Sequence, residues 1–144
     1  MYNNNFTLEV IMKNEIFWLT LTIIITAVFW IPYILNRIAE HTLIPALRNP
    51  NRDARPQSQW ANRMMYAHEN AVENMVLFAP LVLAVHILGL SSSTTILAAM
   101  VYFYARVAHY LLYTFGIPYL RTIAFFVGFL SQMTLAYTIV ESLI

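Results

Sequence analysis

The chain has 144 residues, of which 60% are hydrophobic and 10% charged, and its mean hydropathy is +0.61. A soluble globular domain carries about 25% charged residues, so this composition is typical of a protein whose surroundings are largely lipid. A net charge of +1 excludes a polybasic nucleic-acid surface, and the absence of cysteine excludes disulfides and thiolate metal sites.

The apolar residues gather in four segments that are each long enough to cross a membrane, for which a helix needs about 20 mostly apolar residues. These candidate spans are residues 16–35, 71–90, 95–115 and 120–140. The first contains no charged residue, and its apolar run is too long for a signal peptide. We therefore predict a single transmembrane domain, residues 1–144, with four helical spans.

The connections between these spans indicate how the helices are arranged. Residues 36–62 form a long polar stretch, whereas residues 91–94 and 116–118 are short turns, which are typical of antiparallel neighbours in an all-α, up-and-down bundle. The arginines lie mainly in or beside the long stretch and at Arg121, with Lys13 alone on the opposite side. By the positive-inside rule, we expect residues 36–62 in the cytoplasm and both termini on the other side.

Polar side chains inside the second span need partners, because a charge at the bilayer centre costs roughly 2.5–3.5 kcal/mol on insertion scales. Helical periodicity places five residues on one stripe: Arg63, Tyr66, Asn70, Glu73 and Leu77. We expect Asn70 and Glu73 to point into the bundle. The alternative interpretation is that these groups only bond to one another and fix the packing of helices.

The third span carries a second polar stripe, formed by Tyr102, Arg106, His109, Tyr110 and Tyr113. Arg106 is expected to pair with Glu73, which would reduce the cost of burying either charge. A purely structural ion pair, with the tyrosines as a belt at the membrane interface, is the alternative for this stripe. For Tyr113, near the expected cytoplasmic mouth, a role in ligand binding is favoured.

In the fourth span, Arg121, Phe125, Gly128 and Gln132 share a stripe, and Thr122 points to its side. The short turn before this span predicts that Arg121 lies near Tyr113, although an arginine at this depth also reaches lipid headgroups easily. The histidines show no metal-ligand spacing, so no metal site is predicted. Catalytic triads and phosphate-binding glycine loops are absent from the sequence.

Three motifs resemble those of the MAPEG family, the membrane-associated proteins in eicosanoid and glutathione metabolism. Residues 67–74 (AHENAVEN) resemble its second-helix signature, and residues 105–113 (ARVAHYLLY) resemble its third-helix motif. Residues 116–118 (GIP), followed by Arg121, are similar to the turn into its fourth helix. The resemblance covers about residues 16–140, in the family's order and spacing.

The resemblance implies a four-helix bundle that assembles as a homotrimer and holds glutathione between adjacent subunits, toward the cytoplasmic side. It assigns glutathione binding to Arg37, Asn70, Glu73, Arg106, His109 and Tyr113. It assigns stabilisation of the glutathione thiolate to Arg121, and Thr122 stands where one catalytic branch has serine. The sequence departs from the family at Glu69, where some catalytic members have a basic residue, and at Phe125, where several have tyrosine.

These implications predict a glutathione-dependent membrane transferase or peroxidase, with a lipophilic small molecule as the second substrate and glutathione as co-substrate. One alternative is a non-catalytic bundle of the same fold that binds lipid or stabilises a larger membrane assembly. Another is a small channel or proton relay built from Glu73, Arg106 and His109, for which the sequence supplies no filter. The expected surroundings are the bilayer and further copies of the chain, not nucleic acid.

Overall fold

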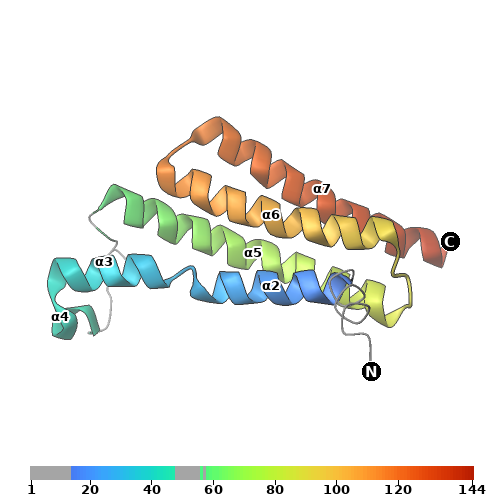
Figure 1. Cartoon of the computed structure of the whole chain (residues 1–144), viewed down its shortest axis with the longest axis horizontal. Coiled ribbons are helices and arrows are strands. Elements are labelled where there is room, and N and C mark those ends of the chain that lie inside the picture. The colour runs from blue at the N-terminus through green and yellow to red at the C-terminus, as the bar shows by residue number, and fades with distance from the viewer. Residues whose placement is uncertain (1–13, 48–55, 57) are drawn as a thin grey trace, which may run out of the picture.

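A computed structural model describes residues 14–47, 56 and 58–144 of the chain. Within these residues every regular element is a helix: α2 (Glu15–Val28), α3 (Ile31–His41), α4 (Leu43–Leu47), α5 (Gln59–Ile87), α6 (Ser93–Phe115) and α7 (Pro118–Leu143) (Figure 1). Lys13, Arg48, Arg52 and Arg55, which contribute to the expected orientation, lie outside the described residues.

Four helical segments are long and apolar enough to cross a membrane, as the sequence predicts. They are Glu15–His41, Gln59–Ile87, Ser93–Phe115 and Pro118–Leu143, and successive segments run in opposite directions along the bundle (Figure 1). The end of α3, the start of α5 and the α6–α7 turn lie at one end of this bundle. The described part of the chain is therefore all helical, and the protein is of the integral, multi-pass membrane type.

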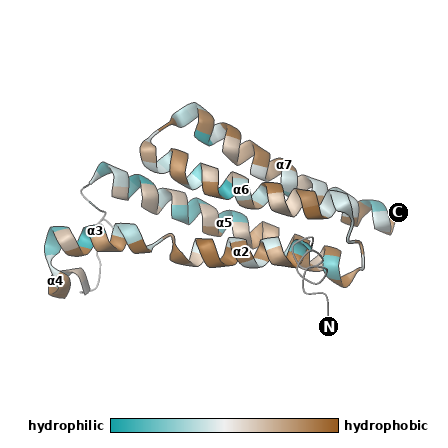
Figure 2. Ribbon diagram, viewed as in Figure 1, coloured by the Kyte–Doolittle hydropathy of each residue, from teal (hydrophilic) through white to brown (hydrophobic). Residues whose placement is uncertain are grey.

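Helical structure extends beyond the predicted spans at this end. α5 begins at Gln59 rather than near Ala71, α3 continues to His41, and α4 lies within the stretch predicted as a polar loop. Hydropathy follows the same division, because hydrophobic residues predominate in α2 and hydrophilic ones are more frequent in α3 and the neighbouring part of α5 (Figure 2). Helix length therefore exceeds the length of the apolar run in the first two spans.

The first span is broken into α2 and α3 at Phe29 and Trp30. Pro32 has no N–H to donate to the carbonyl of Val28, so the regular ladder of hydrogen bonds cannot pass this point. The carbonyl of Phe29 accepts a hydrogen bond from Tyr110 Oη at 2.8 Å, and the two rings stack with their centroids 3.6 Å apart. At the break, the first span is therefore joined to α6 by a hydrogen bond and a stacked pair of rings.

Alanines in its first half and larger apolar residues in its second half make up most of the buried face of α5. Ala61, Ala67 and Ala71 are buried and allow close approach of the neighbouring helices. Further along α5, the ring of Phe78 stacks on Tyr102 of α6, with centroids 3.7 Å apart. The core of the bundle therefore lies along this face of α5, covered by α2, α6 and α7.

At the opposite end of the bundle, a buried carboxylate joins α2 to the α5–α6 turn. Glu15 is 0% exposed and accepts hydrogen bonds from the hydroxyls of Ser91, at 3.0 Å, and Thr95. Thr95 also completes a capping box with Ser92 at the start of α6. Glu15 therefore links α2 to the start of α6, where the capping box satisfies backbone N–H groups of the first turn.

Candidate functional site

Arg121 and Tyr113 face one another across the α6–α7 turn. The guanidinium carbon of Arg121 lies 4.2 Å from the centroid of the Tyr113 ring, which is a cation–π contact. Gly116 adopts a left-handed conformation with φ of 74°, and Pro118 then starts α7. The structure therefore confirms the predicted proximity of Arg121 and Tyr113, and both side chains are only half-buried.

Aromatic rings continue from Tyr113 into the bundle. The buried His109 ring lies 5.6 Å from Tyr113 and 6.2 Å from Phe125, measured between centroids. The guanidinium carbon of Arg106 lies 5.6 Å from the Phe125 ring. The rings of Tyr113, His109 and Phe125 thus lie between Arg121 and Arg106. The positive charge of two partly dehydrated arginines favours the binding of an anion.

Arg106 is 2% exposed, and its Nη1 donates to Asn70 Oδ1 at 3.2 Å. Its Nε and Nη2 have no hydrogen-bond partner among the described residues. Gly128 of α7 lies beside it, and a Cβ there would be in ordinary van der Waals contact, 3.6 Å from Arg106 Nε. The buried positions of Arg106 and Gly128 agree with the stripes predicted for the third and fourth spans.

The predicted pairing of Arg106 with Glu73 is wrong in this protomer. Glu73 is exposed, and Asn70 bonds Arg106 in its place. The buried face of α5 includes Ala71, and each residue of a helix turns it by about 100°, so Glu73 lies about 200° away from that face. Leu77, on the same predicted stripe, is exposed as well.

Glu73 lines a pocket on another side of the protomer, between α3 and α5. This pocket has a volume of about 410 Å³, and its lining includes Tyr33, His68, Glu69 and Glu73. Tyr33 Oη and His68 Nδ1 are 2.9 Å apart and share a hydrogen bond. The residues assigned to glutathione therefore fall into two groups. Glu73 belongs to this pocket, whereas Arg121, Tyr113, His109 and Arg106, with Asn70 bonded to Arg106, form the other group.

Two predicted site residues, Arg37 and Thr122, remain to be placed. Arg37 is half-buried on α3, which packs on α4 and α5. Thr122 is exposed beside the Arg121 stripe, as predicted, and its hydroxyl donates to the carbonyl of Pro118 at 3.0 Å. Its proton is therefore engaged within its own helix.

Some contacts of the site could not be found from sequence patterns. Arg63 Nε donates to the carbonyl of Thr114 at 2.9 Å, which joins α5 to the end of α6. Gln132 Nε2 donates to the carbonyl of Asn74, also at 2.9 Å, and joins α7 to α5. Both contacts link residues that are far apart in the chain, and periodicity within one helix does not predict such a pairing.

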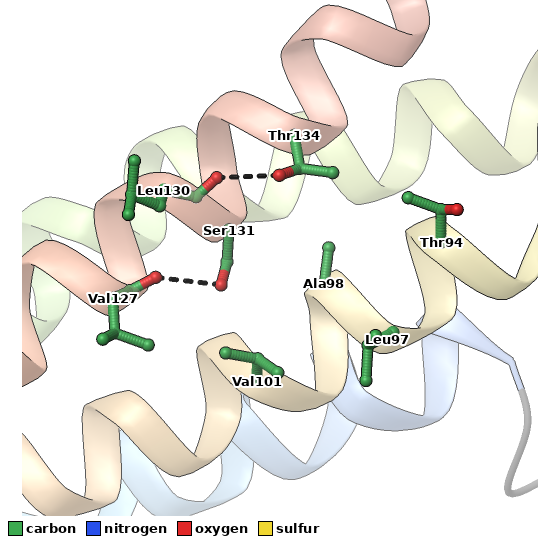
Figure 3. Close-up of a pocket in the computed structure, with 8 residues that line it drawn as sticks. All are labelled: Thr94, Leu97, Ala98, Val101, Val127, Leu130, Ser131 and Thr134. Carbon is green, nitrogen blue, oxygen red and sulfur yellow. Dashed lines mark hydrogen bonds between the residues drawn. The ribbon is translucent and has the colours of Figure 1, made fainter.

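A separate apolar groove of about 380 Å³ lies between α6 and α7 (Figure 3). The hydroxyls of Ser131 and Thr134 are turned to the carbonyls of Val127 and Leu130 of their own helix, each at 3.0 Å. The groove therefore offers almost only apolar surface. Among the described residues, no group of three or more metal-ligating side chains lies close enough to hold an ion.

The comparisons with known proteins give one match. A sequence model of the MAPEG family matches residues 16–140. No curated protein and no solved structure matches the chain. The matched range includes almost all of the four long helices, and both groups of candidate site residues.

Proposed function

Since the chain belongs to the MAPEG family, we propose that it is a glutathione-dependent membrane transferase or peroxidase. Family membership places the protein among membrane proteins related to glutathione or eicosanoid chemistry, and the particular activity is our proposal. The observation that supports it best is the half-buried Arg121 on the face of Tyr113, next to the aromatic rings that continue to Arg106.

Arg121, together with Tyr113, would activate the thiol of glutathione. A free cysteine thiol has a pKa of about 8.5, and only its thiolate is an effective nucleophile. A cation close to the sulfur lowers that pKa, and arginine stays charged when it is partly dehydrated. Tyr113 would hold the Arg121 guanidinium in one plane through the contact of 4.2 Å.

The activated sulfur would then attack a hydrophobic electrophile that reaches the site from the bilayer. In the transferase reaction, a carbon–sulfur bond forms and the leaving group departs or the electrophile takes up a proton. In the peroxidase reaction, sulfur attacks the outer oxygen of a lipid hydroperoxide, the O–O bond breaks, and the lipid leaves as an alcohol. A second glutathione then reduces the sulfenic product, which yields glutathione disulfide and water.

Glutathione carries two carboxylates and one amine, and the two groups of side chains complement these charges. Arg37 and Arg106 would attract the carboxylates, Glu73 the amine, and Asn70, His109 and Tyr113 would complete the site. Glu73 lies in the pocket between α3 and α5, whereas Arg121 lies at the α6–α7 turn. We therefore propose a homotrimer in which neighbouring copies bring these groups together, with the α6–α7 turn on the cytoplasmic side.

The test is an ultraviolet titration of the detergent-purified protein with glutathione, which follows the thiolate absorption band. We expect a saturable band in the unaltered protein and its loss in Arg121→Leu, with Arg121→Lys intermediate because lysine is a point charge without the planar contact to Tyr113. If an intact oligomer shows neither a band nor saturable binding, the enzyme proposal is wrong.

A non-catalytic bundle that binds lipid or stabilises a membrane assembly is the second candidate. Phe125 favours it, because this ring has no hydroxyl to offer glutathione where several family members have tyrosine, and the Thr122 hydroxyl is bonded to Pro118. This alternative predicts that Arg121→Leu changes neither membrane assembly nor the partners that co-purify with the protein.

A further inference from the structure

The end of α6 is closed by two kinds of hydrogen bond. The last carbonyls of a helix have no partner within it. Here the N–H of Ile117 donates to the carbonyl of Leu112 at 2.9 Å, and the N–H of Gly116 donates to that of Tyr113 at 3.0 Å. The carbonyl of Thr114 instead accepts from Arg63 Nε, at 2.9 Å. A side chain of α5 thus completes the turn between α6 and α7.

The guanidinium of Arg63 also lies close to the backbone of the turn at position 116. A Cβ on Gly116 would lie 3.4 Å from both Cζ and Nε of Arg63, and the φ of 74° already favours glycine there. The guanidinium is therefore held by a hydrogen bond on one side and by the backbone of the turn on the other. A cation at this place also complements the negative end of the helix dipole of α6.

The turn that Arg63 completes separates the two members of the cation–π contact. Tyr113 precedes Gly116, and the N–H of Arg121 donates to the carbonyl of Ile117 at 3.2 Å, in the first turn of α7. A shift of the turn would therefore alter the distance of 4.2 Å between Arg121 and the Tyr113 ring. Arg63 connects this geometry to α5, the helix that carries Asn70 and Glu73.

We infer that Arg63 is a positioning residue for thiol activation: it fixes the α6–α7 turn against α5, and so fixes Arg121 relative to Tyr113 and to Asn70 of the same protomer. This inference rests on the proposed function. Arg63 needs no contact with glutathione for this role. Lysine would keep the charge at the end of α6, but it lacks the planar group that fits between Gly116 and the carbonyl of Thr114.

The experiment is a pH titration of the thiolate band in glutathione-saturated protein, in detergent, with oligomer size checked for each variant. We expect Arg63→Gln to raise the midpoint by about one pH unit, which corresponds to a tenfold fall in the ionisation constant of the bound thiol. The glutathione concentration for half-saturation should change much less. Arg63→Lys should give an intermediate midpoint, and His41→Gln, at an exposed basic residue of the same end, an unchanged one.

A purely structural cap predicts a different result, in which Arg63→Gln lowers thermal stability and leaves the midpoint where it is. That result would overturn the inference, and so would a wild-type midpoint in Arg63→Lys if Arg63→Gln does not fold. A band that is lost in Arg121→Leu but unchanged in both Arg63 variants would overturn this inference alone. The absence of a band in the unaltered protein would overturn the proposed function together with it.

Discussion

At the scale of single residues, Arg106 shows how a charge is accommodated inside this bundle. Arg106 donates a hydrogen bond to Asn70 instead of forming the expected ion pair with Glu73. A neutral amide accepts the hydrogen bond without adding a second buried charge, whereas an ion pair would require dehydration of both groups. Asn70 therefore has a structural role that is independent of any ligand.

We expect Asn70→Leu to lower the free energy of unfolding by about 1–3 kcal/mol, because it leaves the guanidinium of Arg106 with an unsatisfied donor. Glu73→Gln, on the exposed side of the same helix, should change it by less than about 0.5 kcal/mol. Unfolding in mixed detergent micelles without glutathione measures both. Equal losses in the two variants would contradict the assignment of this stabilising contact to Asn70 alone.

At the scale of elements, α6 and α7 agree with the sequence predictions better than α5 does. Tyr102, Arg106 and His109 are buried on one stripe, as are Gly128 and Gln132, because each helix meets its neighbours along one face. The buried residues of α5 are all apolar, so its polar stripe did not identify its buried side. Its alanines mark that side, since small residues permit close helix packing.

Sequence patterns did not predict the contacts between residues that are far apart in the chain. Glu15 stands at the start of an apolar run, and nothing in its own neighbourhood indicates that Ser91 and Thr95 will donate to it. Arg63 likewise resembles any basic residue near a span end. The residue types of the site were therefore predictable from the sequence, but their partners depend on which helix ends lie together in three dimensions.

The break in the first span gives a prediction at the same scale. Tyr110→Phe removes the hydrogen bond to the carbonyl of Phe29 and keeps the stacked ring, so we expect a loss of about 0.5–1.5 kcal/mol in the free energy of unfolding. Tyr110→Leu removes both contacts and should cost clearly more. Thermal unfolding of the two variants side by side provides the measurement, and a Tyr110→Phe loss as large as that of Tyr110→Leu would assign the whole contact to the hydroxyl.

At the scale of the whole molecule, the division of the candidate site between two sides of one protomer is the main finding. The pocket with Glu73 lies between α3 and α5, and Arg121 lies at the α6–α7 turn. A ring of copies that meet head to tail would place unlike surfaces against one another. A site shared between neighbours would then be complete only in the assembly.

Mixed oligomers test this arrangement. We expect Arg121→Leu and Glu73→Ala to be inactive when each is expressed alone, and co-expression of the two to restore roughly a quarter of the wild-type activity. This fraction follows because each shared site draws its two halves at random from neighbouring copies in a closed ring. Activity per oligomer with a lipophilic electrophile is the measurement. No recovery in oligomers shown to contain both variants would place the whole site within one copy.

The break between α2 and α3 also has a consequence for motion. No residue of α3, Ile31–His41, is buried, whereas α5 beside it contributes much of the core. A segment with little buried surface opens at a small free-energy cost, on its own, while the rest of the molecule stays folded. Backbone amides of α3 should therefore exchange with deuterium well before those in the middle of α5. The helix that carries Arg37 and Tyr33 would then be the part of the bundle that swings aside to admit a molecule from the water.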